Sequence, residues 1–154
     1  MNENQNENQT QTQTLKSTTH VNFRGDARAA LEFYRDVFGG ELTVITYGAM
    51  NAAQSPEEAD QIMWGQVTAP SGFAIMAYDV PADRPYDKGV APFFESVRGQ
   101  SVEDVTPVWE KLSDGAVILQ DLKPSPWAPA YGMLTDRFGL TWVVDVAAGG
   151  PPAT

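Results

Sequence analysis

Residues Val21 to Val44, VNFRGDARAALEFYRDVFGGELTV, decide the fold that we predict for this chain. They begin with a short alternation of apolar and polar residues, continue with apolar residues at helical spacing, and end with a Gly-Gly pair and a second apolar alternation. This pattern predicts a strand, a helix with Asp26 as its N-cap, and another strand. Gly39 and Gly40 supply the left-handed backbone that ends such a helix.

A weaker copy of this stretch follows about 74 residues later. Residues 96–119 read SVRGQSVEDVTPVWEKLSDGAVIL. In both copies an Arg-Gly pair closes the first strand, an aromatic residue lies late in the helix, and a glycine ends it. A repeat of this length predicts one structural module used twice.

Two further apolar runs follow each copy, which completes a module of one helix and four strands. Residues 61–69 and 73–80 are separated by Pro70-Ser71-Gly72, and residues 131–136 and 140–146 by Arg137-Phe138-Gly139. Both separators predict hairpin turns. The predicted fold class is therefore α+β, with two βαβββ modules that form curved mixed sheets around a cleft.

Two stretches of the second module predict local irregularity. Pro107 conflicts with a helix interior, so we expect the regular helix to begin only near Val105, although Ser101 and Asp104 resemble a capping box. Residues 123–129 contain three prolines, which predicts a loop that carries Trp127.

Composition sets the expected domain boundaries. Residues 1–17 are almost entirely polar and predict a disordered tail. Residues 18–147 form the predicted domain, with modules at 18–80 and 92–147 joined by a proline-rich linker. Residues 148–154 predict a flexible end.

Charge and cysteine content narrow the classes of function. The formal net charge is -10, which disfavours nucleic acid as a partner, and the chain has no cysteine. No segment approaches the roughly 20 apolar residues that cross a bilayer, and the N-terminus lacks the features of a signal peptide. We therefore expect a cytoplasmic protein without a membrane partner.

The chain resembles the vicinal oxygen chelate superfamily, which includes glyoxalase I, extradiol dioxygenases and bleomycin-resistance proteins, and within it the PhnB-like branch. The residues that carry the resemblance are Val21–Gly25, Ala30–Tyr34, Val37–Glu41, Ile62-Met63, Trp127 and the stretch from Tyr131 to Trp142. This resemblance implies two modules that enclose a cleft, in a homodimer.

Catalytic members of that superfamily hold a divalent metal with His, Gln or Glu side chains at four matched strand positions. At these positions this chain is expected to place His20, Trp64, Phe94 (by the 74-residue offset) and Val143. A first-row divalent ion needs about three nitrogen or oxygen ligands, and His20 is the only histidine. The expectation is therefore no metal cofactor, unless a one-residue strand shift turns Glu95 inward.

The predicted chemistry is binding of a small molecule, such as a cationic or aromatic ligand, as in antibiotic sequestration. The resemblance implies that several aromatic and polar side chains border one cleft, and apolar walls with few polar groups are typical of ligand pockets. The candidate ligand-binding residues are His20, Trp64, Gln66, Phe94, Trp127 and Tyr131.

Two alternatives stay open, and no catalytic residue is assigned. One is a metal-dependent enzyme of the glyoxalase or dioxygenase type, in which His20 takes part. The other is a non-catalytic dimeric scaffold with a vestigial cleft. His20 alone is also consistent with a general base, or with a strand residue bonded to backbone.

Overall fold

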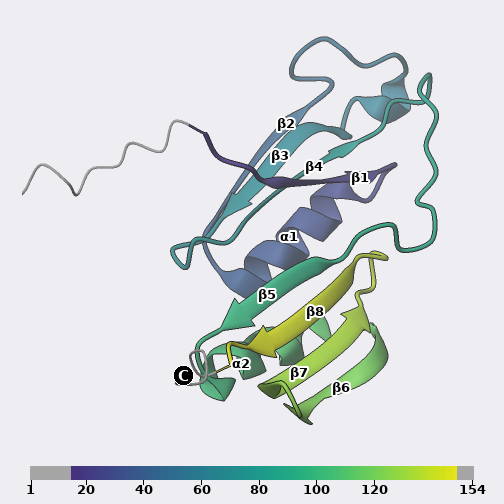
Figure 1. Ribbon diagram of the computed structural model, residues 1–154. Coiled ribbons are helices and arrows are strands. Elements are labelled where there is room, and N and C mark those ends of the chain that lie inside the picture. The colour runs from purple at the N-terminus through teal and green to yellow at the C-terminus, as the bar shows by residue number, and fades with distance from the viewer. Residues whose placement is uncertain (1–14, 149–154) are drawn as a thin grey trace, which may run out of the picture.

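The computed structural model describes residues 15–148 and contains two four-stranded sheets, each with one long helix on one face (Figure 1). The first half comprises β1 (Thr19–Phe23), α1 (Ala27–Phe38), β2 (Glu41–Thr46), the short 3-10 helix η1 (Pro56–Glu58), β3 (Ile62–Thr68) and β4 (Ala74–Asp79). The second half comprises β5 (Glu95–Gly99), α2 (Val102–Leu112), β6 (Val117–Ser125), β7 (Ala128–Thr135) and β8 (Thr141–Val146).

Both sheets have the same topology. Their strand orders are β1-β4-β3-β2 and β5-β8-β7-β6, and in each the first and last strands of the module pair in parallel while the other pairs are antiparallel. This confirms the predicted α+β class, the repeated βαβββ module and the mixed sheets. Both predicted hairpins, β3–β4 and β7–β8, are present.

The start of α1 is capped by a residue from outside the helix. Asp26 occupies the N-cap position as predicted, but its side chain makes no capping hydrogen bond. Instead Asp79, at the end of β4, accepts hydrogen bonds from the backbone N–H groups of Gly25 (2.6 Å) and Ala27 (3.1 Å). The Asp79 side chain thus satisfies the backbone N–H of Ala27 at the start of the helix, a role that the sequence had assigned to the neighbouring Asp26.

The expectation for the start of α2 was wrong. The helix begins at Val102 and continues past Pro107 to Leu112. It begins this early because the Ser101–Asp104 capping box is fully formed and fixes its first turn. Pro107 lies five residues beyond Val102 and removes one interior hydrogen bond, a cost that the cap and the packing of Val105 and Leu112 outweigh.

The predicted loop at 123–129 was also wrong. β6 continues to Ser125, and only Pro126 and Trp127 remain outside the strands. β6 lies at the sheet edge and its register with β7 shifts at several points, so Pro124 needs no ladder hydrogen bond.

One glycine in each module lets the helix approach its sheet. A Cβ on Gly65 would lie 2.4 Å from the Leu31 side chain of α1, and a Cβ on Gly132 would lie 2.8 Å from Trp109 of α2. These two glycines on β3 and β7 therefore face the helices. Their neighbours along each strand face the opposite side, which we call the open face of each sheet.

The two modules share one hydrophobic core, in which α1 contacts α2. Buried side chains come from both halves, including Tyr34 and Trp142, whose rings lie 5.6 Å apart. No helix within residues 15–148 is long and apolar enough to cross a membrane. The cytoplasmic location and the domain boundaries stay predictions. Most of the predicted tail (1–17) and almost all of the predicted flexible end (148–154) lie outside the described residues.

Candidate functional site

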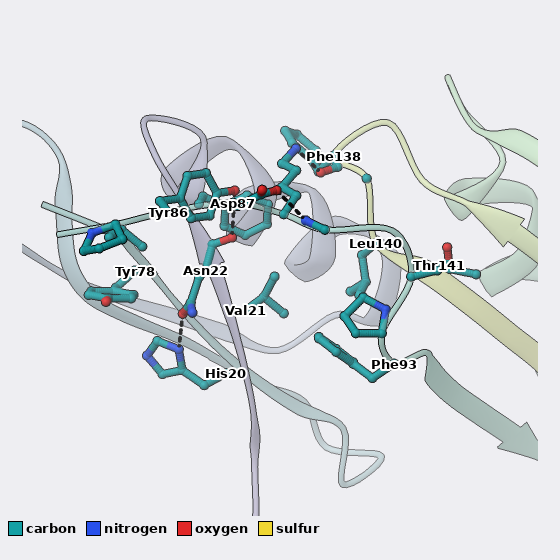
Figure 2. Close-up of a pocket in the computed structure, with 18 of the residues that line it drawn as sticks. His20, Val21, Asn22, Tyr78, Tyr86, Asp87, Phe93, Phe138, Leu140 and Thr141 are labelled. Atoms are coloured by element: carbon teal, nitrogen blue, oxygen red, sulfur yellow. Dashed lines mark hydrogen bonds between the residues drawn. The ribbon is translucent and has the colours of Figure 1, made fainter. Parts of the chain in front are cut away.

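A cavity of about 780 Å³ lies between the modules, bordered by β1, the linker after β4, and the β7–β8 turn. Figure 2 shows residues that line it, with His20 and Tyr78 on one side of β1 and Phe93 and Leu140 on the other. This volume falls in the range of roughly 300–1,000 Å³ that is typical of small-molecule pockets.

One wall of the cavity is polar and is built on β1 and β4. His20 Nδ1 lies 3.1 Å from Asn22 Oδ1, and the His20 ring stands edge-on to Tyr78 at 5.1 Å between centroids. The Tyr86 hydroxyl donates to the backbone carbonyl of Asn22 at 3.2 Å. These groups can orient a ligand through hydrogen bonds.

The opposite wall is apolar. Val21, Phe93, Phe138 and Leu140 contribute to it, and in Figure 2 Phe93 and Leu140 lie across the space from His20. Phe138 belongs to an aromatic cluster with Phe23, Phe33 and Tyr34. Its position in this wall is therefore fixed by contacts with buried core residues. An apolar or aromatic part of a ligand fits this side.

Arg24 holds the linker over the cavity. Its guanidinium donates to the backbone carbonyls of Val80, Pro81 and Arg84, and it lies 5.3 Å from the Tyr86 ring centroid. Farther along the linker, Lys88 Nζ donates to the carbonyl of Phe138 in the β7–β8 turn at 3.0 Å. The linker is therefore attached to both modules.

The structure brings three of the six predicted site residues together on one sheet. His20 and Gln66 both pair with Met76, and Trp64 Nε1 lies 3.3 Å from the Met76 sulfur. All four side chains belong to the open face of the first sheet. Only His20 among the predicted residues also lines the cavity.

The other three predicted residues belong to the second module. Tyr131 lies on the open face of its sheet, next to Gly132, and contacts Trp127 edge-on at 5.3 Å between centroids. Trp127 is 59% exposed at the β6–β7 turn. Phe94 is 47% exposed and directly precedes β5. That the six residues surround one ligand stays a prediction.

The strand registers revise the match between the two modules. Following the strand pairs outward from the two helix-facing glycines leads to Val21 on β1 and to Val97 on β5. Ser96 is therefore the counterpart of His20, whereas the predicted Phe94 lies two residues earlier. The offset at this strand is 76 residues, because the Arg-Gly pairs aligned in sequence sit at different heights in the two sheets.

Sequence reasoning missed the linker as part of a site. Tyr86 and Lys88 of the linker, with Phe93 just after it, line the cavity, but the three prolines between 80 and 92 suggested only a connection. The available signal was Tyr86 within this short proline-rich segment and Phe93 just after it, since aromatic rings in loops often contact ligands.

The family follows from the sequence itself. A sequence profile of the Glyoxalase/Bleomycin resistance protein/Dioxygenase superfamily matches residues 18–144. This chain belongs to that superfamily. The repeated βαβββ topology is consistent with it, and the superfamily resemblance predicted from the sequence is confirmed.

Relatives of this superfamily resemble the chain over nearly its whole length. Protein YjdN of Escherichia coli K12 is 27% identical over 143 residues, which cover 86% of this chain and 95% of YjdN. The crystal structure of protein PA1353 from Pseudomonas aeruginosa is 31% identical, covers 87% of this chain and 98% of its own, and has a TM-score of 0.73. A Bacillus cereus structure described as a putative 3-demethylubiquinone-9 3-methyltransferase, PhnB protein, is 24% identical, with coverages of 86% and 100% and a TM-score of 0.69, and shares the fold.

The residues present do not fit the metal centre of the superfamily's catalytic members. Within residues 15–148, no group of three or more His, Cys, Asp or Glu side chains could hold an ion. His20 stands in a row with Met76 and Gln66, and its counterpart row contains Ser96 and Val143. One imidazole and one amide are too few ligands for a first-row divalent ion.

Glu95 does not supply the missing ligand. It pairs with Trp142, which is fully buried, so its side chain is directed to the helix side of the second sheet and not to the open face. Burial raises the pKa of Glu95 above its ordinary value, while a hydrogen bond from Thr19 opposes that rise. The strand shift that would turn Glu95 to the open face is absent.

Proposed function

We propose that this superfamily member binds a small molecule in the cavity between its modules, without a metal ion. One observation carries the proposal: the cavity joins a polar wall at His20 and Asn22 to an apolar wall at Phe93 and Leu140. A ligand with an aromatic body and a hydrogen-bonding end matches this division, and the net charge of -10 favours a neutral or cationic ligand.

The proposal is tested by a thermal-shift and fluorescence screen of aromatic and cationic aromatic compounds. Two adjacent residues provide a matched pair of variants. Phe93 lines the cavity and is 51% exposed, whereas Phe94 is 47% exposed and is not among the lining residues. Phe93→Ala is expected to weaken binding roughly tenfold, the effect of losing one well-packed ring, and Phe94→Ala to leave it nearly unchanged.

The opposite order of binding affinities for these two variants would indicate that the ligand binds in the cleft expected from the sequence. If Phe94→Ala weakens binding and Phe93→Ala does not, the cavity is not the site. If no compound in the screen binds, the non-catalytic scaffold is favoured. Elemental analysis covers the enzyme alternative, because stoichiometric metal that is lost in His20→Ala contradicts metal independence.

A homodimer is part of the same proposal. Trp64 and Tyr131 flank the two equivalent glycines on the open faces, and the exposed Trp127 contacts Tyr131. A second copy that covers these faces would bury the exposed ring of Trp127 and the partly exposed rings of Trp64 and Tyr131. Light scattering of the purified protein gives the mass directly, and a monomer at micromolar concentration would contradict this part of the proposal.

A further inference from the structure

The cavity opens along the free edge of β1. This strand pairs only with β4, so its other edge has no neighbouring strand in the sheet. Four consecutive residues, His20 to Phe23, line the cavity. Because successive side chains of a strand point to opposite faces, a space that contacts all four must lie beside the strand.

The direction of the backbone groups on this edge follows from two hydrogen bonds. Val80 N–H donates to the carbonyl of Phe23 at 2.7 Å, so Phe23 and Val21 direct their backbone groups toward β4. His20 and Asn22 therefore direct theirs toward the cavity. The Tyr86 hydroxyl, which reaches the Asn22 carbonyl from the cavity side, confirms this alternation.

Three backbone groups are left without a partner along this edge. They are the N–H and C=O of His20 and the N–H of Asn22. Among residues 15–148, no loop backbone group or side chain makes a hydrogen bond to any of them. Exposed edge groups of this kind are the template on which strand addition occurs.

The cavity walls match the alternation of an added strand. On one side of the edge lie Val21 and Leu140, with Phe93 and Phe138 nearby; on the other lie His20, Asn22 and Tyr78 (Figure 2). Successive side chains of a strand beside β1 would therefore meet an apolar wall and a polar wall in turn.

We propose that the ligand class is a short peptide, or a peptide-like amide, that binds in extended form as an additional strand on β1. The peptide backbone forms hydrogen bonds with the free backbone groups of His20 and Asn22. A central apolar or aromatic side chain of the peptide contacts Val21, Leu140 and Phe93. About three residues suffice, because the free groups span roughly two strand residues. This inference rests on the proposed function, since it concerns the same cavity.

Capped tripeptides test the inference directly. The probe is acetyl-Thr-Phe-Thr-amide, measured by titration calorimetry, and its control is the same peptide with methylated backbone nitrogens. Methylation removes the donors and blocks edge pairing while it keeps the side chains. The methylated peptide is expected to bind at least tenfold more weakly, because it loses the hydrogen bond to the His20 carbonyl and its methyl groups keep its own carbonyls away from the N–H groups of His20 and Asn22. Equal binding would overturn strand addition.

Amide hydrogen exchange gives a second readout that side-chain binding alone does not produce. The N–H groups of His20 and Asn22 are expected to exchange rapidly in the free protein and to become protected by the tripeptide. Those of Val21 and Phe23 are expected to be protected in both states. No change at His20 and Asn22 at saturating peptide contradicts the inference.

A pair of variants separates the Asn22 backbone from its side chain. Asn22→Ala and Asn22→Pro both remove the amide side chain, but only the proline removes the N–H that faces the cavity. Proline is tolerated on an edge strand where its nitrogen faces outward, so the β1–β4 pairing is expected to persist. Asn22→Pro is expected to bind the tripeptide roughly threefold to tenfold more weakly than Asn22→Ala. Equal binding by the two variants would contradict the inference. If Asn22→Pro does not fold, the comparison of the unmethylated and methylated peptides on the parent protein still tests the inference.

The inference and the proposed function can fail separately. If aromatic compounds bind with the expected Phe93→Ala sensitivity while the tripeptide does not bind, strand addition is wrong and the small-molecule site stands. If neither class binds, both are wrong.

Discussion

The hydroxyl of Tyr34 donates a hydrogen bond of 2.8 Å to the carboxylate of Asp136, and this contact joins α1 of the first module to the β7–β8 turn of the second. The same Asp136 oxygen accepts a hydrogen bond from Trp142 Nε1 at 2.8 Å, while the other oxygen accepts from the backbone N–H groups of Phe138 and Leu140. Burial, followed by the nearby Asp136 charge, raises the pKa of Tyr34 well above its ordinary value. Tyr34 therefore stays a protonated donor throughout the usual pH range.

Removal of the Tyr34 hydroxyl is expected to destabilise the fold. Tyr34→Phe leaves the buried Asp136 carboxylate one donor short, which costs about 1.5–3 kcal/mol for a hydrogen bond to a charged group. The control is Tyr47→Phe, whose buried hydroxyl donates to the neutral carbonyl of Asp79 at 2.7 Å, and a loss of about 1 kcal/mol is expected there. Urea unfolding at pH 7 compares them, and an equal or smaller loss in Tyr34→Phe would contradict this role.

Glu95 is expected to make stability fall as the pH rises. Because burial raises its folded pKa above the ordinary 4.5, the folded state holds the proton more tightly than the unfolded state. Stability is lost as the pH rises from about the unfolded value through the raised folded value, and the loss persists above that window. Glu95→Gln is therefore expected to be more stable than the parent at pH 7, by about 0.5 kcal/mol given the half-exposed site, and to lose this advantage near pH 4.

The control for Glu95 is Glu110→Gln, which removes the same charge from an exposed position on α2. The readout is the difference between urea unfolding free energies at the two pH values. If Glu95→Gln and Glu110→Gln show the same pH dependence, Glu95 has no special part in it.

The two helix-facing glycines are expected to resist substitution unequally. An alanine Cβ at Gly65 meets the flexible end of Leu31, whereas at Gly132 it meets the Trp109 ring and, at 2.9 Å, the Leu122 Cα. Overpacking typically costs about 1–3 kcal/mol, and we expect Gly132→Ala at the upper end and Gly65→Ala at the lower end. Thermal unfolding measures the order. Leu31→Ala is expected to relieve part of the Gly65→Ala cost in a double-mutant cycle, and strict additivity would contradict the contact.

Arg24 is expected to control access to the linker. Arg24→Ala removes the donors to three linker carbonyls, so trypsin is expected to cut at Lys88 several times faster than in the parent. Arg28→Ala, an exposed change on α1, is the matched control. Circular dichroism checks that the fold is unchanged, and an unaltered cleavage rate would show that Arg24 does not restrain the linker.

Local pattern predicted the secondary structure well where one signal dominated. The helical spacing between Asp26 and Gly39, the two hairpin turns and the repeat itself gave the βαβββ modules. Local pattern failed where two signals competed. At Pro107 the capping box outweighed the proline, and after Lys123 the edge position of β6 allowed a proline to stay in the strand.

The candidate site was predicted only in part, because it depends on contacts between distant segments. The resemblance to the superfamily implied that His20, Trp64 and Gln66 border one cleft, and the strand registers place them on one face of the first sheet beside Met76. Nothing local to residues 80–93 indicates that Arg24 draws this segment over β1. The linker wall was therefore missed.

The sequence by itself determined the repeated module, its helix and strand order, and the scarcity of metal ligands, since these depend on local periodicity and on residue types. The tertiary structure alone decided that Asp79 caps α1, that Asp136 joins the modules, and that Ser96 is the counterpart of His20. It also decided that the free edge of β1 opens on a cavity. These features arise from hydrogen bonds and strand registers between residues far apart in the chain, which no local pattern specifies.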